Sequence, residues 1–316
     1  MIKINKLISV LSPIDFIVVV FYLFLTAVNL IFMERVTNWQ TLIIMNAGIL
    51  SIVFGLAYFS EKKNHPIITH LRYWYLIPLI FITFKELYYL AYPIHGVDYD
   101  TYLIAIDRFI FGFDPTVALY KIANPYLTEL LQIVYGTFFF LPVLLAADLL
   151  MNSRWKELEY HAFIIVFGFI LSYTGYLFFP AVGPRFTLHD FTLLNEQLPG
   201  LFLTNYLRDI VNAGESIKSG AVDAVKYVQR DVFPSGHTQM TILVMYLSWK
   251  FKTKTRWFFL VTGSLLVFST VYLRYHYVVD VLGGFVFVVL TLWLGKHIFN
   301  WWKGVRKEEK FDLSSY

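Results

Sequence analysis

Two short clusters of polar residues carry the groups needed for chemistry on a phosphate, and both stand at the start of strongly apolar segments. The first is the run Phe-Pro-Ser-Gly-His-Thr at 233–238, and the second extends from Arg274 through His276 to Asp280. A polar side chain inside a membrane segment costs about 2–3 kcal/mol unless it has a partner or a use. The two clusters therefore indicate a functional site.

The first cluster has the properties of an anion-binding turn. Pro234 suits the first turn of a helix. Ser235, Gly236 and His237 would then offer backbone N–H groups and the positive end of the helix dipole to a phosphate.

The second cluster offers a nucleophile with an orienting partner. His276 and Asp280 are four residues apart, so on one helix face the carboxylate could hold the imidazole in one tautomer and stabilise its cation. A single buried histidine is more often structural. Two histidines, an aspartate and an arginine at successive segment entrances favour catalysis.

The elements that position these residues are predicted to be membrane-spanning helices. The chain has 316 residues, of which 58% are hydrophobic, 19% aromatic and 15% charged, and it contains no cysteine for disulfides or thiolate metal sites. This composition predicts an all-α membrane protein, a polytopic bundle of about eight transmembrane helices. The apolar segments lie at 15–33, 41–60, 73–92, 126–151, 160–180, 234–250, 257–274 and 278–299.

The distribution of basic residues predicts the orientation of the bundle. Fifteen of the 26 Lys and Arg residues, among them Lys3 and Lys6, fall in the N-terminal segment, three short loops and the C-terminal tail, all on one side. Short basic segments stay in the cytoplasm. Both termini are therefore expected to be cytoplasmic, and both polar clusters to face the extracytoplasmic side of a multi-pass membrane protein.

Two motifs resemble those of a known family. Pro234-Ser-Gly-His237 resembles the central motif of the type-2 phosphatidic acid phosphatase superfamily, and the run from His276 to Gly284 resembles its last motif, H-Y-x-x-D-v-l-x-G. The first family motif, a Lys followed six residues later by Arg-Pro, is replaced here by Gly183-Pro-Arg185 without the Lys. This variant, together with the stretch 107–116, is similar to the branch of fungal inositol phosphorylceramide synthase and its bacterial relatives.

The resemblance implies a six-helix phosphatase-like core within a catalytic membrane domain, 93–316, preceded by N-terminal transmembrane helices at 1–92. It implies metal-independent and cofactor-free phosphoryl transfer through a phosphohistidine. His276 would attack phosphorus while Asp280 orients it, and His237 would protonate the leaving group. The phosphate would be bound by Arg185, Arg274 and the backbone at Ser235 and Gly236. The bacterial relatives favour a bacterial inner or plasma membrane.

Two basic residues stand at positions that differ from the family pattern. The family's usual Arg stands six residues before the nucleophilic His, at the position of Thr270 here, and Arg274 is one helical turn further on. Lys85 lies deep in the third apolar segment. It either forms a structural pair with a carboxylate such as Glu129 or replaces the missing motif Lys at the phosphate.

Three functions remain open from the sequence. The chain could hydrolyse a lipid phosphate or diphosphate, or transfer a phospho-head-group to an alcohol such as inositol. It could also be a transporter or binding protein for a phosphorylated ligand, although the polar residues cluster on one face and no inverted repeat is visible. The expected partners are a lipid phosphate substrate, a polar alcohol acceptor and membrane lipids, and no nucleic acid.

Overall fold

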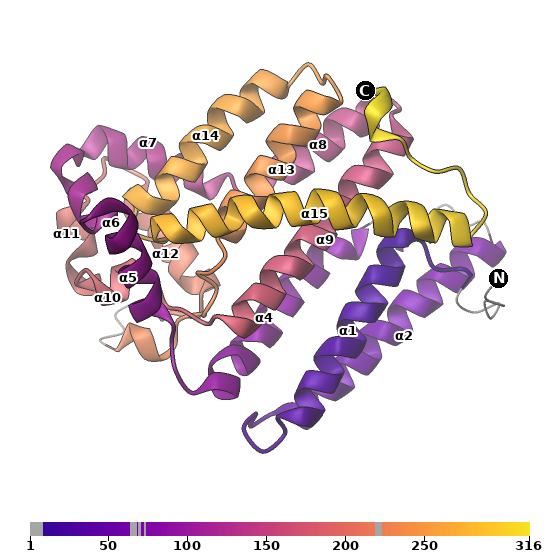
Figure 1. The fold of residues 1–316 in the computed structure, drawn as a ribbon, viewed down its shortest axis with the longest axis horizontal. Helices are drawn as coiled ribbons and strands as arrows, with labels where there is room; N and C mark the ends of the chain where they lie inside the picture. Colours follow the sequence, from indigo (N-terminus) through magenta and orange to yellow (C-terminus); the bar gives the residue numbers. More distant parts are fainter. Residues whose placement is uncertain (1–8, 64–67, 69–70, 73, 219–222) are drawn as a thin grey trace.

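The computed structural model describes residues 9–63, 68, 71–72, 74–218 and 223–316, and in this part of the chain the regular structure is entirely helical (Figure 1). Lys3 and Lys6 lie outside the described residues. The longer helices are α1 (Pro13–Ile31), α2 (Trp39–Lys63), α4 (Leu76–His95), α5 (Asp100–Phe111), α7 (Pro125–Gly136), α8 (Phe140–Met151), α9 (Trp155–Phe178), α12 (Thr204–Gly214), α13 (Gly236–Lys250), α14 (Arg256–Tyr272) and α15 (Val278–Val305). The short ones are α6 (Pro115–Ala118), α10 (Pro184–Thr187), α11 (Leu194–Gln197) and 3₁₀ turns at Leu119–Ile122, Phe191–Leu193, Ala224–Lys226 and Leu313–Ser315.

The prediction of a polytopic helical membrane protein is confirmed, and each of the eight apolar segments is helical. Among the described residues, five helices (α1, α2, α4, α9 and α15) are long and apolar enough to cross a membrane. The fourth predicted segment differs from expectation, because α7 and α8 meet at an angle of 56°. Counted as one span, this bent pair gives a sixth. Helices α13 and α14 are shorter, at 15 and 17 residues.

Helix α9 is the centre of the bundle. It contacts α1, α4, α8, α13 and α15. In α9, 72% of an 18-residue apolar stretch is buried. In α2, which packs at the periphery, the buried share of such a stretch is 28%. Helix α15 has 28 residues, about 42 Å of helix at 1.5 Å per residue, and extends along the length of the molecule (Figure 1). This frame fixes the start of α15, where the second polar cluster lies.

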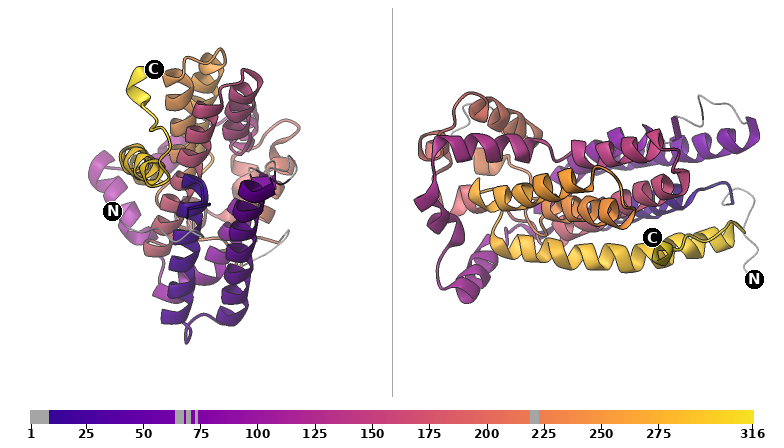
Figure 2. Two further views of the ribbon diagram at one scale, coloured as in Figure 1. Left: turned by 90° about the vertical axis from the view of Figure 1, so that its right-hand side faces the viewer. Right: turned by 90° about the horizontal axis from the view of Figure 1, so that it is seen from above.

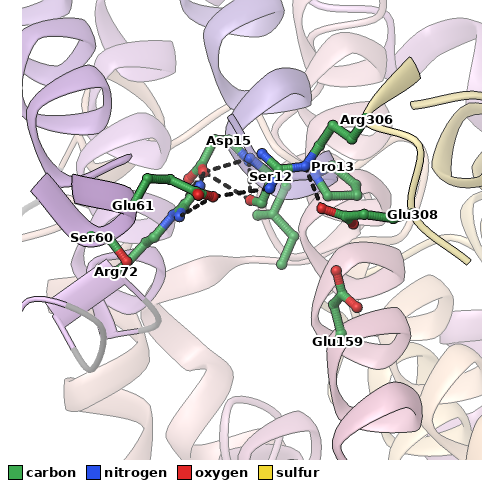
Figure 3. Close-up of a pocket in the computed structure, with 10 residues that line it drawn as sticks. Ser12, Pro13, Asp15, Ser60, Glu61, Arg72, Glu159, Arg306 and Glu308 are labelled. Carbon is green, nitrogen blue, oxygen red and sulfur yellow. Dashed lines mark hydrogen bonds and ion pairs between the residues drawn. The ribbon is translucent and has the colours of Figure 1, made fainter. Parts of the chain in front are cut away.

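The two ends of the bundle differ in structure. The short helices α6, α10 and α11 gather at one end together with α5 and α12, and the C-terminal segment lies toward the other (Figures 1 and 2). At that other end ionised side chains surround a cavity of about 210 Å³ (Figure 3). We call this group the terminal cluster: Asp15, Glu61, Arg72, Glu159, Lys303, Arg306 and Glu308. It ties α1, α2, α9 and α15 together by ion pairs.

Candidate active site

The two polar clusters meet at the end of the bundle that holds the short helices. Ser235 is the N-cap of α13, where its hydroxyl accepts from the Thr238 N–H at 3.2 Å, and its own N–H donates to the Asp280 carbonyl at 3.0 Å. A Cβ at Gly236 would lie 2.3 Å from the Tyr176 hydroxyl oxygen, so only glycine fits there. The close approach fixes the start of α13 against α9 and α15. The Ser235 N–H is therefore already paired with Asp280, which was not expected, and a phosphate-binding role for the backbone of Ser235 and Gly236 stays a prediction.

The two histidines face one another. His276 Nε2 lies 3.4 Å from His237 Nδ1. On its other side, His276 Nδ1 lies 3.0 Å from the carbonyl oxygen of Val232. A carbonyl only accepts hydrogen bonds, so Nδ1 carries the proton and Nε2 keeps its lone pair. Burial lowers the pKa of His276 to about 3, which keeps the ring neutral. Nε2 is thus a free base in contact with a second imidazole.

Asp280 lies beside His276 in a different way from the one predicted. Helix α15 begins at Val278, so His276 precedes it and the two do not share a helix face. Asp280 is at the third helical position, where its Oδ2 accepts from the Tyr277 N–H at 2.8 Å and lies 3.5 Å from His276 Nδ1. Among the described residues, Asp280 Oδ1 has no hydrogen-bond partner. The direct orienting group is the Val232 carbonyl; stabilisation of the imidazolium by Asp280 stays a prediction.

Arg185 is buried at the start of α10. The turn before it needs glycine, because Gly183 has φ +95° and a Cβ would lie 2.9 Å from the Tyr275 carbonyl oxygen. Arg185 Nη1 donates to Asn212 Oδ1 at 3.2 Å, and Nη2 forms an ion pair with Glu215. In the described part of the chain nothing accepts from its Nε. The guanidinium therefore keeps an unused donor at Nε, while the Glu215 carboxylate occupies Nη2.

A stack of planar groups, which the sequence reading missed, joins Arg185 to His237. The Arg185 guanidinium carbon lies 4.7 Å from the centre of the Tyr275 ring, and Tyr275 stacks on Tyr135 at 4.4 Å. Tyr135 in turn stacks on His237 at 4.6 Å and an interplanar angle of 21°. Phe138, in the bend between α7 and α8, packs against His237 at 4.2 Å. The predicted phosphate ligand and the predicted proton donor are thereby held in one assembly.

Arg274 contacts Gln197 and Tyr120. Helix α14 ends at Tyr272, and Arg274 has a left-handed backbone with φ +67°, so the expected shared helix face with Thr270 is wrong. Its Nη1 donates to Gln197 Oε1, and its guanidinium lies 5.6 Å from the centre of the Tyr120 ring. Its role in phosphate binding stays a prediction.

Lys85 reaches the same loop that contacts Arg185. Its Nζ donates to the Gly214 carbonyl at 2.6 Å and to the Ser216 hydroxyl at 2.8 Å. The alternative pairing with Glu129 is not formed, because the Glu129 carboxylate accepts from the backbone N–H groups of residues 201–204. Lys85 and Arg185 thus hold residues 212–216 from two sides. Whether Lys85 also binds phosphate stays a prediction.

Asp231 is an acidic member of the site that the sequence reading did not select. Burial raises its pKa to about 7, while the charges of Arg185 and Lys85 oppose the shift. The Asp231 carboxyl therefore lies in the electrostatic field of both cations. Its place two residues before Phe233-Pro-Ser-Gly-His was a usable signal in the sequence. In the part of the chain that the structure describes, no three His, Asp or Glu side chains form a candidate metal site.

The geometry defines a class of membrane protein with paired histidines and buried arginines at one end of a helical bundle. The sequence matches the family model of the PAP2 superfamily over residues 101–294, more than half of the chain, so the protein belongs to this superfamily. It is also 28% identical over 120 residues to a PA-phosphatase related-family protein of Dictyostelium discoideum. That match covers 38% of this chain and 20% of the relative, so the chain spans about a fifth of the relative's length. No solved structure has significant similarity to the chain.

Membership in the superfamily implies phosphatase-type lipid phosphoryl chemistry in a membrane protein. The finer resemblance to inositol phosphorylceramide synthase stays a prediction.

Proposed function

We propose that the protein transfers the phosphoryl group of a lipid phosphate or diphosphate through a phosphohistidine, at the extracytoplasmic face of the membrane. The observation that carries this proposal is the fixed tautomer of His276, whose Nδ1 donates to Val232 while its unprotonated Nε2 faces His237 at 3.4 Å. A nucleophile held by one partner next to a second proton-transfer group is the arrangement that covalent catalysis requires.

The reaction has two steps. His276 Nε2 forms a bond to phosphorus as the bond from phosphorus to the leaving oxygen breaks, and His237 gives a proton to that oxygen. His237 then takes the proton of the acceptor hydroxyl, whose oxygen attacks phosphorus as the bond to Nε2 breaks. Arg185, buried and with a free Nε, would balance the charge of the transferred group. Because both steps use protein groups alone, we expect EDTA to leave the rate unchanged.

The acceptor decides between hydrolysis and transfer. Purified protein is given a lipid phosphate labelled with phosphorus-32, with and without myo-inositol or another polyol. Hydrolysis releases inorganic phosphate in both cases, whereas transfer appears as a labelled polyol phosphate only when the polyol is present. A phospho-head-group donor tested in the same way reports head-group exchange. Absence of all these products and of acid-labile label on the protein would overturn the proposal and leave a binding or transport function.

The orientation is tested by cysteine labelling, since the chain has no cysteine of its own. In intact cells, Lys218→Cys should react with an impermeant thiol reagent and Lys254→Cys should not, although both side chains are exposed. The reverse result would place the site on the cytoplasmic side.

A further inference from the structure

Helix α5 lies outside the two polar clusters, yet it buries two carboxylates against them. Asp100 and Asp107 are 4% and 2% exposed. They are seven residues apart, so they lie on one face of the helix, about two turns from each other. Elsewhere on the same helix, Tyr102 and Phe109 are 68% and 90% exposed. A buried carboxylate requires compensating hydrogen bonds, so both aspartates must have partners.

Asp100 joins the two segments that carry Arg185 and His276. Its Oδ2 accepts from the Val182 N–H at 2.9 Å, and its Oδ1 accepts from the Gly183 N–H at 2.8 Å. These two residues form the turn before Pro184 and Arg185. Oδ1 also accepts from the hydroxyl of Tyr277, the residue after His276, at 2.8 Å.

Asp107 holds the start of α15. Its Oδ2 accepts from the Val278 N–H at 2.9 Å and its Oδ1 from the Val279 N–H at 2.7 Å. The first N–H groups of a helix have no partner within the helix, and an anion there is favourable. Asp107 therefore supplies, from another helix, the cap that fixes where α15 begins. That start determines the position of His276 two residues earlier.

We propose that Asp100 and Asp107 are positioning residues that make α5 a brace between Arg185 and His276. This inference rests on the proposed function. The brace would set the separation between the guanidinium that binds the phosphate and the Nε2 that attacks it. Misplacement of a reacting group by about 1 Å can cost about 100-fold in rate.

The test compares Asp100→Asn and Asp107→Asn with Asp114→Asn. In Asp100→Asn and Asp107→Asn, one carboxylate oxygen is replaced by an N–H₂ group that faces a backbone N–H. Two donors then face each other, so one hydrogen bond is lost and the contact becomes unfavourable. Asp114 precedes α6 in the same part of the chain, and its carboxylate pairs with the exposed Arg108, so it is the matched control. For each variant, kcat per folded molecule, KM and Tm are measured in detergent, the folded fraction being taken from size-exclusion chromatography.

We expect kcat per folded molecule to fall about 10- to 100-fold in Asp100→Asn and Asp107→Asn, with KM within about threefold of wild type. Asp114→Asn should match wild type. A merely structural role would lower Tm and the folded fraction but leave kcat per folded molecule unchanged, and that result overturns the inference. If neither Asn variant folds, Tyr277→Phe decides, because it keeps the ring and removes the hydroxyl that donates to Asp100, with Thr187→Val as the control for the second contact of that hydroxyl. Tyr277→Phe should lower kcat, and an unchanged kcat again overturns the inference. Failure of the proposed function is distinguishable, because wild type itself would then form no phosphohistidine.

Discussion

The terminal cluster and the candidate active site both gather charged side chains, but the two regions differ in how these side chains are paired. In the terminal cluster each cation has carboxylate partners, as with Arg306 against Glu61 at 2.9 Å and Arg72 against Asp15 at 2.6 Å (Figure 3). In the active site Arg185 Nε and Asp280 Oδ1 have no partner among the described residues. An unsatisfied buried polar group costs about 1–3 kcal/mol. The two unpaired atoms of the candidate site are available to a ligand, whereas the paired charges of the terminal cluster serve stability.

The largest expected effect at the active site is that of His276→Asn. The amide N–H₂ can still donate to the Val232 carbonyl, so the fold should be kept while the nucleophile is lost. We expect turnover to fall by at least about 10⁴-fold, as when a member of a catalytic triad is removed, and the acid-labile phosphorus-32 label to disappear. Label that persists on this variant would assign the nucleophile elsewhere. Unchanged Tm is the control for folding.

The next effect is that of His237→Ala, which removes the proton donor. General acid catalysis contributes about 10²–10⁴-fold and matters most for a poor leaving group. The loss should therefore be large with a lipid phosphate and much smaller with an aryl phosphate that has an acidic phenol. The comparison of the two substrates is the measurement. Rescue of His276→Asn instead of His237→Ala by the aryl phosphate would mean that the two roles are reversed.

Glu215→Gln tests whether the ion pair described in the candidate active site limits phosphate binding, unlike the ion pairs of the terminal cluster. Glu215 pairs with Arg185, so its neutralisation should free the guanidinium for phosphate. A hydrogen bond to a charged group contributes about 1.5–3 kcal/mol, so we expect inorganic phosphate to inhibit about tenfold more strongly. Asp209→Asn is the matched control, because it removes the same charge from an exposed position of α12. Equal inhibition of wild type and Glu215→Gln would show that phosphate does not bind at Arg185.

Asp231→Asn should change the pH dependence by a smaller factor. Burial raises the pKa of Asp231 to about 7, so the carboxyl is neutral below this pH and an anion above it. In the proposed mechanism this anion would compete with substrate phosphate for Arg185. We therefore compare kcat/KM of Asp231→Asn with kcat/KM of wild type at each pH. The ratio of variant to wild type should rise about threefold to tenfold as the pH increases through 7. Ionisation of the substrate cancels in this ratio, and a flat ratio contradicts the assignment.

The smallest effect on activity is expected in the terminal cluster. Arg306 donates to the carbonyls of Ser9 and Leu11 and pairs with Glu61. Arg306→Ala should lower the free energy of unfolding by about 1–3 kcal/mol, seen as a lower Tm in detergent, with kcat per folded molecule unchanged. Lys156→Ala removes an exposed pair with Glu309 and should shift Tm very little. Loss of kcat in Arg306→Ala would mean that the two ends are coupled.

Sequence predicted the helices well because a membrane span is fixed by the length of an apolar run. It did not predict the break between α7 and α8, which interrupts an apolar run near Phe138 without a proline at that position. The His237 and His276 contact followed from motif residues. The orienting carbonyl of Val232 could not be predicted, because every residue has a backbone carbonyl and the residue type does not show which one is used. The capping role of Asp107 depends on a contact across 171 residues of sequence, which spacing along one helix cannot reveal.

Helix α7 carries two of the contacts described above on one rigid element. Glu129, near its start, holds the backbone of residues 201–204 and with it the beginning of α12, whereas Tyr135, near its end, stacks on His237. A tilt of α7 about the bend that follows it would move both at once. The start of α12 and the ring stacked on His237 would then shift together. Helix α7 would in this way transmit a displacement of the 201–204 backbone to the ring of His237.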